Sequence, residues 1–489
     1  MKERITLIVV LLAGILLSSL AIAWWRRVSD ASTVKKRLPL AEELADFSAP
    51  AEVLQDHVVI GEYFSEFDGV PSKAGGTWPS FRGANHDNIA ADGARLAESW
   101  PASGPPVLWS IALGEGYAGP AVRDGCVYLL DYDNKANADA LRCFSMDKGK
   151  EIWRRWYRVR VKRNHGMSRT VPAVSGRYVV TIGPRCHVMC VNSRTGGLRW
   201  GIDLEKEWGT TVPMWYAGEC PLIDGNQAVI AVGGKTALLI GVDLETGKVV
   251  WQTPNPRRWQ MSHSSVVPLQ VDGKKMYVYC ALGGIVGVSA ETADRGAVLW
   301  ETDEWNHQVV APAPVSLGDG RLFVTAGYGV GSAMFQVTQE SGRYSVKLLY
   351  RSDKKSFACE QHTPVFYKGY LYSVLPADAG AARRQAVCMD PAGRIMWHSG
   401  SGERFGLGPF MIADGKMLIL DDNGLLTMIR ATESGYVKIA RAKVLEGNEA
   451  WAPMALVNGL LLVRDYGEMR CLDLRAKEQA PSHTGTAAD

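Results

Sequence analysis

The sequence predicts an all-β fold, an eight-bladed β-propeller, because two features recur along it at the same interval. The first is an aromatic residue that closes a short strand every 43 to 51 residues, with one further matching position near Ala440. These blade aromatics are Trp109, Trp153, Trp200, Trp251, Trp300, Tyr350 and Trp397. The second is a turn, found at Asp124-Gly125, Ser175-Gly176, Asp224-Gly225, Asp272-Gly273, Asp319-Gly320, Lys368-Gly369, Asp414-Gly415 and Asn458-Gly459. A period in the forties to fifty with four short strands is typical of propeller blades, so eight turns predict eight blades.

One unit, from Cys220 to Trp251, shows the expected strands clearly. Asp224-Gly225 is a turn signal, the runs 227–232 and 237–242 are β-prone, and Thr246-Gly247 leads into the closing strand. These runs are too short for ordinary helices and show no period near 3.6. A meander of this size cannot bury its own faces, so it needs neighbours of the same kind.

The two ends of the repeat region predict how the ring closes. The last unit, Trp451 to Leu474, has no closing strand of its own, whereas the strand Val107 to Ile111 precedes the first unit. We therefore expect these segments to share one blade.

The blade aromatics are expected to be structural. Twisted sheets arranged in a ring leave a wedge between neighbours on the outer side, which an indole fills while its N–H reaches a backbone carbonyl. Such residues identify a fold and carry no chemistry.

The N-terminal segment predicts a transmembrane helix. Ile5 to Trp25 is an uncharged run of 21 residues, long enough to cross a bilayer. Ala21-Ile22-Ala23 resembles a cleavage site, so a removed signal peptide is the alternative, but the Trp-Trp-Arg-Arg at 24–27 favours an uncleaved anchor. In both cases we expect the body in the periplasm or another extracytoplasmic space, although basic residues after the span favour the opposite orientation.

The expected organisation has four parts. Residues 1–27 form the anchor or signal peptide, residues 28–77 a linker with a short amphipathic helix within 38–57, residues 78–478 the propeller, and residues 479–489 a disordered tail.

Charge excludes one class of partner. The net charge of +3 over 489 residues argues against a nucleic-acid-binding surface. Residues 154–163 form a basic run. Within it Arg158, Arg160 and Lys162 alternate with Val159 and Val161 as on a strand with one wet face, which favours a solvated blade edge. Binding of this run to anionic lipid or to an acidic partner is the alternative.

The segment 78–109 carries a family resemblance. Trp78-Pro79-Ser80-Phe81-Arg82-Gly83, Trp100-Pro101 and Leu108-Trp109, followed by the Asp-Gly turns and Thr-Gly-Lys-x-x-Trp closures, resemble the pyrroloquinoline-quinone (PQQ)-like β-propeller repeat proteins. This family includes the envelope protein BamB and the quinoprotein alcohol dehydrogenases. The resemblance implies an eight-bladed ring. It also implies a non-catalytic, monomeric scaffold that binds protein partners in the cell envelope or, alternatively, a PQQ-dependent dehydrogenase of alcohols or sugars with calcium.

The cysteines favour the scaffold. A dehydrogenase of this family holds its cofactor against a disulfide between adjacent cysteines, and none of the nine cysteines here is adjacent to another. They are expected to be small buried residues, with Cys186 and Cys190 the one pair worth checking for a bond. The nine histidines are scattered and form no zinc motif. We therefore expect no catalytic residue, no metal and no cofactor.

The channel mouth is the candidate binding site. Innermost strands line the axis of a propeller, and the segments leading into them form its binding face. By register these segments contribute Tyr117, Arg169, Glu219, His263, His307, His362 and Trp451. Trp451 is expected to stack on a ligand, Arg169 to pair with an anionic group, and Glu219 to accept a donor or bind a cation.

Overall fold

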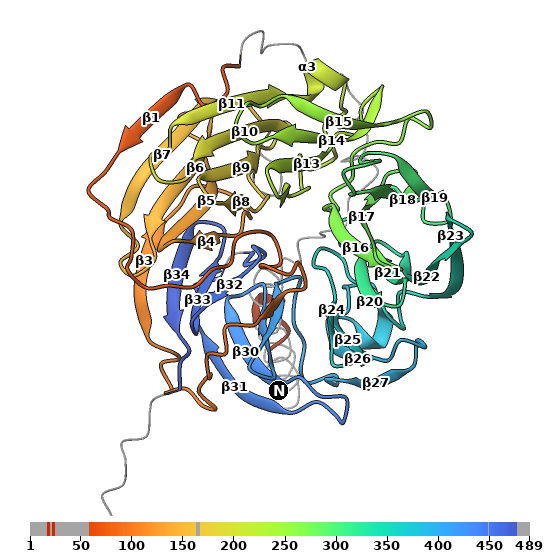
Figure 1. Cartoon of the computed structure of the whole chain (residues 1–489). Helices are drawn as coiled ribbons and strands as arrows, with labels where there is room; N and C mark the ends of the chain where they lie inside the picture. The colour runs from red at the N-terminus through yellow and green to blue at the C-terminus, as the bar shows by residue number, and fades with distance from the viewer. Residues whose placement is uncertain (1–16, 20–21, 25–57, 163–166, 448, 477–489) are drawn as a thin grey trace, which may run out of the picture. The chain divides into compact units, whose positions relative to one another are not determined.

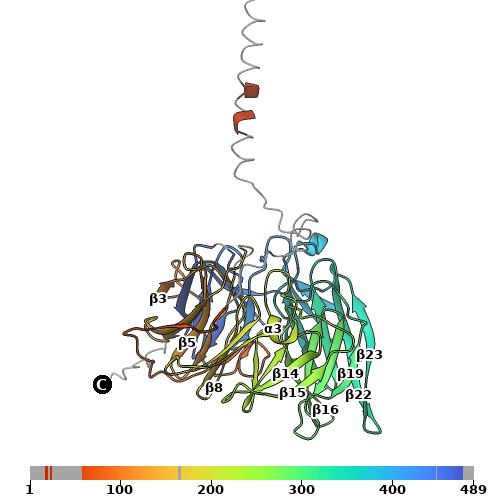
Figure 2. The ribbon, with the colours of Figure 1, turned by 90° about the horizontal axis from the view of Figure 1, so that it is seen from above.

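Eight antiparallel sheets surround a common axis, which confirms the predicted eight-bladed propeller (Figure 1). The computed structural model describes residues 17–19, 22–24, 58–162, 167–447 and 449–476. Blades are numbered in chain order, and each runs from an innermost to an outermost strand. Figure 2 shows the same blades from a second direction.

The first four blades each contain four consecutive strands. Blade 1 consists of β4 (Ala121–Arg123), β5 (Cys126–Asp133), β6 (Ala138–Ser145) and β7 (Glu151–Arg158). Blade 2 consists of β8 (Ala173–Ser175), β9 (Tyr178–Ile182), β10 (His187–Asn192) and β11 (Leu198–Asp203), followed by helix α3 (Leu204–Trp208). Blade 3 consists of β12 (Leu222–Asp224), β13 (Gln227–Ala231), β14 (Ala237–Asp243) and β15 (Val249–Pro254). Blade 4 consists of β16 (Val267–Val271), β17 (Lys274–Ala281), β18 (Gly284–Ser289) and β19 (Val298–Thr302).

The remaining blades follow the same order. Blade 5 consists of β20 (Val315–Gly318), β21 (Arg321–Ala326), β22 (Gly331–Glu340) and β23 (Arg343–Ser352). Blade 6 consists of β24 (Val365–Tyr367), β25 (Tyr370–Val374), β26 (Ala386–Met389) and β27 (Ile395–His398), with the 3-10 helix η1 (Gly380–Ala382) between β25 and β26. Blade 7 consists of β28 (Phe410–Ala413), β29 (Lys416–Leu420), β30 (Leu425–Arg430) and β31 (Lys438–Lys443). Blade 8 consists of β32 (Ala455–Val457), β33 (Leu460–Arg464), β34 (Glu468–Asp473) and β3 (Val107–Ala112).

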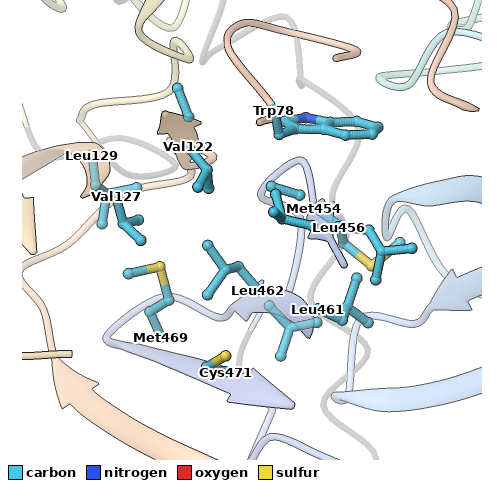
Figure 3. Packing of buried hydrophobic residues seen from close by; sticks show 14 of the residues in the cluster. Trp78, Val122, Val127, Leu129, Met454, Leu456, Leu461, Leu462, Met469 and Cys471 are labelled. Atoms are coloured by element: carbon cyan, nitrogen blue, oxygen red, sulfur yellow. The ribbon is translucent and has the colours of Figure 1, made fainter. Parts of the chain in front are cut away.

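Blade 8 closes the ring as predicted. Strand β3 pairs antiparallel with β34. The outermost strand of blade 8 therefore comes from the chain before blade 1, and the other three strands come from the end of the repeat region. Figure 3 shows the apolar packing where blade 8 meets blade 1, including Val122 and Leu129 of blade 1 and Leu462 and Met469 of blade 8. The buried Arg464 ties the two blades together, because its Nη1 donates to the Ala118 and Leu130 carbonyls, each at 3.1 Å.

Every blade aromatic lies on the fourth strand of its blade, beside a β-bulge. Trp153, Trp200 and Trp397 each pair with a cysteine of the neighbouring strand, and the register shifts immediately after that pair. Trp251 and Trp300 face glycines instead. The small opposing residue leaves room for the ring, which explains why cysteines recur. All nine cysteines are free and buried, Cys186 and Cys190 included, which confirms the interpretation as small core residues.

Each wedge also involves the following blade. The indole N–H of Trp109 donates to the Met146 carbonyl at 2.9 Å, and that of Trp200 to the Leu244 carbonyl at 3.0 Å. In the next blade a glycine with positive φ packs under the ring: a Cβ on Gly247, at φ 72°, would lie 2.5 Å from Cγ of Trp200. Not every blade indole donates to a backbone carbonyl as predicted, because the indole N–H of Trp251 donates to the Gln227 side chain. Blade 7 has Ala440 at the wedge position, opposite Met428.

Two further strands come from residues before the first blade. Strand β1 (Tyr63–Glu66) pairs antiparallel with β7 and extends blade 1, so part of the stretch 28–77, expected to be a linker, belongs to the ring. Strand β2 (Ile89–Ala90) pairs parallel with β28 on the axial side of blade 7. Sequence reasoning missed both strands, because neither belongs to the repeat.

Strand β1 changes the interpretation of the basic run. The first half of the run lies on strand β7, which is an interior strand between β1 and β6. The second half keeps the predicted wet face, because Arg158, Arg160 and Lys162 are exposed and alternate with the buried Val159 and half-buried Val161. Nη1 of Arg155 donates to the Gly61 carbonyl at 2.7 Å, and its guanidinium lies 4.8 Å from the Phe64 ring. Arg154 forms an ion pair with Glu151 at 2.8 Å. Arg155 thus helps to hold β1 against the blade, whereas the Arg154–Glu151 pair lies within β7.

The axial segment, defined as residues 77–96, crosses the middle of the ring. Trp78 exchanges two 2.8 Å backbone hydrogen bonds with Val122 of β4, and the Pro79 carbonyl accepts one from Val174 of β8. Phe81 packs against two core clusters, one formed mainly by blades 1, 7 and 8 and the other by blades 4 and 5. The segment thus contacts innermost strands around the axis and occupies space that a repeat alone would leave open.

Several expectations concern residues outside the described part of the chain. These are the amphipathic helix within 38–57, the tail 479–489 and most of the anchor 5–25, of which residues 17–19 and 22–24 are helical. Among the described residues, no helix combines the length and hydropathy needed to cross a membrane.

Candidate functional site

The candidate site is built by loops that lead into or connect the inner strands. Tyr117, Arg169, His263, His362 and Trp451 precede the innermost strands of blades 1, 2, 4, 6 and 8. Tyr328 and Tyr466 lie in hairpins of blades 5 and 8. We call the residues Tyr117, Arg169, Trp215, His263, Tyr328, His362, Glu449, Trp451 and Tyr466 the mouth cluster.

The first half of the mouth cluster lies where blades 8 and 1 meet. The Tyr117 ring lies 5.0 Å from Trp451 and 5.9 Å from Tyr466, and its hydroxyl donates to Glu449. The Trp451 indole in turn donates to Asp422 at 2.7 Å. Burial and the neighbouring Glu449 carboxylate raise the pKa of Tyr117 far above its ordinary value, so it stays a neutral donor.

The second half comes from blades 3, 4 and 5. The Trp215 ring stacks on His263 at 6.0 Å and on Tyr328 at 5.7 Å, with interplanar angles of 24° and 29°. His263 is also fixed by its backbone, whose N–H donates to the Val310 carbonyl at 3.0 Å. Three flat side chains from three blades therefore form one stack.

Arg169 connects the two halves. Its guanidinium carbon lies 5.9 Å from the Tyr117 ring, and its charge also acts on Tyr328 and His263. Burial lowers the pKa of Arg169 to about 10, which still leaves it a cation at neutral pH. The mouth cluster thus combines aromatic faces with one fixed positive charge.

Two histidines of the cluster are neutral at neutral pH. Burial lowers the pKa of His263 to about 3, with Arg169 lowering it further, and burial lowers the pKa of His362 to about 4. Nδ1 of His263 and Nε2 of His362 are buried and make no hydrogen bond to the described residues. A neutral imidazole offers one donor and one acceptor, so each histidine has hydrogen-bonding capacity left over.

The backbone of the mouth cluster is strained. Trp215, Tyr328 and Glu449 have φ values of 64°, 56° and 56°, in the left-handed region that favours glycine. Tyr216, next to Trp215, has φ 70°. Left-handed residues at Asp124, Asp272 or Asn458 need no such explanation because they lie in hairpin turns. Backbone strain at bulky residues tends to occur at functional sites, so it marks this cluster as a candidate.

Two of the residues predicted from the sequence do not join the cluster. Glu219 is fully buried, its Oε1 accepts from the Ala231 N–H at 3.3 Å, and burial raises its pKa well above the ordinary value. Its Oε1 is bonded within its own blade, and the role expected of Glu219 toward a ligand stays a prediction. His307 packs edge-on against Trp305 at 4.5 Å, near Arg351 of the outermost strand β23.

Sequence reasoning missed Trp215, Tyr328, Glu449 and Tyr466. All four lie on loops whose length and sequence differ from blade to blade. One signal was available: Gly327-Tyr328-Gly329 places an aromatic residue between two glycines at a hairpin, where a tight, left-handed backbone is expected.

The residues present do not fit the PQQ and calcium of the dehydrogenase alternative. All nine cysteines are free and none is adjacent to another in sequence, so no disulfide of the required kind can form. Over the described ranges, no three His, Cys, Asp or Glu side chains are grouped so as to hold a metal ion. We therefore derive no chemistry through these groups.

Comparison with known proteins agrees with the repeat pattern and the fold. The model of a family described as outer membrane protein assembly factor BamB matches residues 136–374. Among solved structures, BamB from Moraxella catarrhalis is 14% identical with a TM-score of 0.52, over 76% of this chain and 99% of its own. The chain is a PQQ-like β-propeller protein. No curated protein sequence matches it.

Other solved structures share the propeller fold without pointing to one function. The quinohemoprotein alcohol dehydrogenase from Comamonas testosteroni is 12% identical with a TM-score of 0.57, over 83% of this chain and 81% of its own. The computationally designed protein Ika8 is 11% identical with a TM-score of 0.50, over 75% of this chain and 99% of its own. Identities this low establish the fold alone, so function must be argued from the mouth cluster.

Proposed function

We propose that this PQQ-like propeller is a non-catalytic scaffold of the cell envelope, which binds a protein partner at the mouth cluster and is anchored to the membrane by its N-terminal segment. The observation that carries the proposal is the strained aromatic stack of Trp215, His263 and Tyr328, together with Tyr117 and Trp451 across Arg169.

The chemistry of the cluster suits binding. Aromatic rings and arginine dominate the energetics of protein interfaces, because they bury much area with few rotatable bonds. Left-handed backbone fixes the aromatic rings before binding, and this lowers the entropy cost of association.

The envelope location rests on the sequence. The uncharged run from Ile5 to Trp25 is long enough for a membrane span, and the family model that matches is described by an outer-membrane assembly factor. A fusion test checks it: a periplasm-active reporter at the C-terminus is expected to be active. Activity of a cytoplasm-only reporter at that position would contradict the proposed orientation.

A cofactor titration separates the scaffold from the dehydrogenase alternative. The purified full chain is mixed with calcium and PQQ, and the absorbance of bound quinone and the reduction of a dye with alcohols or sugars are followed. We expect neither a stoichiometric complex nor turnover. A stoichiometric, active complex would overturn the scaffold proposal.

A further inference from the structure

A buried arginine at the axis has more donors than acceptors. Arg82 belongs to the axial segment and is 4% exposed. Its Nη2 donates to the carbonyls of Asp87 at 3.3 Å and Pro364 at 3.0 Å. These are its only hydrogen bonds to the described residues, and Nε is both buried and without an acceptor. Three of the five guanidinium N–H groups therefore lack a protein partner.

The charge of Arg82 is compensated only at a distance, because the Asp87 carboxylate raises its pKa without forming an ion pair with it. Both of its acceptors are backbone carbonyls, and across the described ranges no carboxylate lies within ion-pair distance of it. Burial lowers the pKa of Arg82 to about 10, so the group remains charged at neutral pH. Buried charges in proteins are normally paired, because an isolated one loses its hydration without replacement.

A small cavity adjoins this arginine. It lies between the axial segment and blades 3 and 4, has a volume of about 10 Å³, and is lined among others by Arg82, His86, Cys220 and Ser265. Such a volume admits one particle the size of a water molecule.

The polar groups around the cavity are donors or neutral. Burial lowers the pKa of His86 and raises that of Cys220 to about 12, so neither supplies a negative charge. Ser265 Oγ accepts from the Cys220 N–H at 3.0 Å, and its own hydroxyl hydrogen has no acceptor among the described residues. Arg82 is the only charged residue of the lining.

The backbone that places Arg82 is strained. Arg82, His86 and Asn88 have φ values of 65°, 57° and 64°, three left-handed non-glycine residues within seven positions. No repeat requires this conformation, and it is maintained only because surrounding contacts enforce it.

We propose that this cavity binds a small monovalent inorganic anion, chloride in the cell, held by the guanidinium of Arg82 and the hydroxyl of Ser265. A water molecule could accept these donors, but it would leave the buried guanidinium without a directly contacting negative charge, since Asp87 acts on it only at a distance. Because Arg82 belongs to the axial segment and Ser265 leads into blade 4, the anion fastens the segment to the ring.

The first test measures thermal unfolding of the full chain in detergent, in sodium chloride and in sodium gluconate of equal ionic strength. Chloride is expected to raise the Tm by on the order of 1–3 °C, since a ligand that binds only the folded state stabilises it. The shift should disappear in Arg82→Gln and shrink in Ser265→Ala. It should persist in Arg343→Gln, a matched control at an exposed arginine of β23.

The second test does not depend on a variant that might fail to fold. Crystals of the full chain grown in sodium bromide are expected to give an anomalous peak within hydrogen-bonding distance of Arg82. A water molecule alone at that position would overturn the proposal. An unchanged wild-type Tm in chloride, or a full chloride effect in Arg82→Gln, would also overturn it.

Discussion

The outer ring of blade aromatics and the mouth cluster use the same residue types for opposite purposes. On the outer ring, Trp109 and Trp200 lie opposite a small residue beside a bulge and donate to a carbonyl of the next blade. At the mouth, Trp215 and Tyr328 occupy left-handed backbone and contact residues of other blades. The first set is regular and relaxed, whereas the second is irregular and strained. Strain, and not aromatic content, therefore distinguishes the candidate site.

The largest expected effect is loss of a wedge ring. Trp153 is 1% exposed, so Trp153→Ala should lower the free energy of unfolding by about 3–5 kcal/mol. Trp251→Ala, at a partly exposed wedge, should cost less. Urea unfolding of both variants measures the two losses. Equal losses would contradict the claim that a wedge aromatic stabilises the ring in proportion to its burial.

Gly247, which packs under the Trp200 ring, tests the wedge contact from the side of the neighbouring blade. In Gly247→Ala the new Cβ meets Trp200 at 2.5 Å, and φ is 72°, so we expect a loss of about 2–4 kcal/mol. Gly342→Ala is the matched control, because φ is 80° and no atom lies within 4 Å. It should cost only the backbone strain of about 1–2 kcal/mol. Identical losses would rule out the wedge contact as the cause.

His362 tests the electrostatics of the mouth. The unfolded chain takes up a proton near the ordinary histidine pKa of 6.5, whereas folded His362 does so only near pH 4. Stability from the neutral ring is therefore complete above pH 6.5 and is lost as the pH falls towards 4. Relative to His362→Gln, the wild type should lose about 1.4 kcal/mol per pH unit in that window. A difference between the two that does not vary with pH would show that His362 is not buried as a neutral ring.

The smallest expected effect on stability comes from Tyr328→Gly. The change removes ring contacts but also relieves a left-handed backbone at φ 56°, a strain of about 1–2 kcal/mol. The two effects nearly cancel, so the Tm should hardly change while partner binding is lost. A large drop in Tm would place Tyr328 with the structural aromatics.

The repeat made most of the fold predictable, and its interruptions hid the rest. The wedge aromatics and the seam strand β3 follow from spacing, because each blade must solve the same packing problem. Strand β1, strand β2 and Arg82 occur once each, so no period reveals them. Register placed Tyr117, Arg169 and Trp451 together at the mouth, but it could not show that Glu219 lies buried or that His307 packs away from the cluster.

The most direct test of the central claim, that the mouth cluster is where a partner binds, is site-specific photo-crosslinking in cells. A photoreactive phenylalanine analogue is placed at Tyr328 in the mouth cluster or at Leu349, an exposed residue of the outer strand β23. We predict a single defined adduct from position 328 that disappears in the Trp451→Ala background, and none from position 349. No adduct at 328, or the same adduct at both positions, would contradict the account.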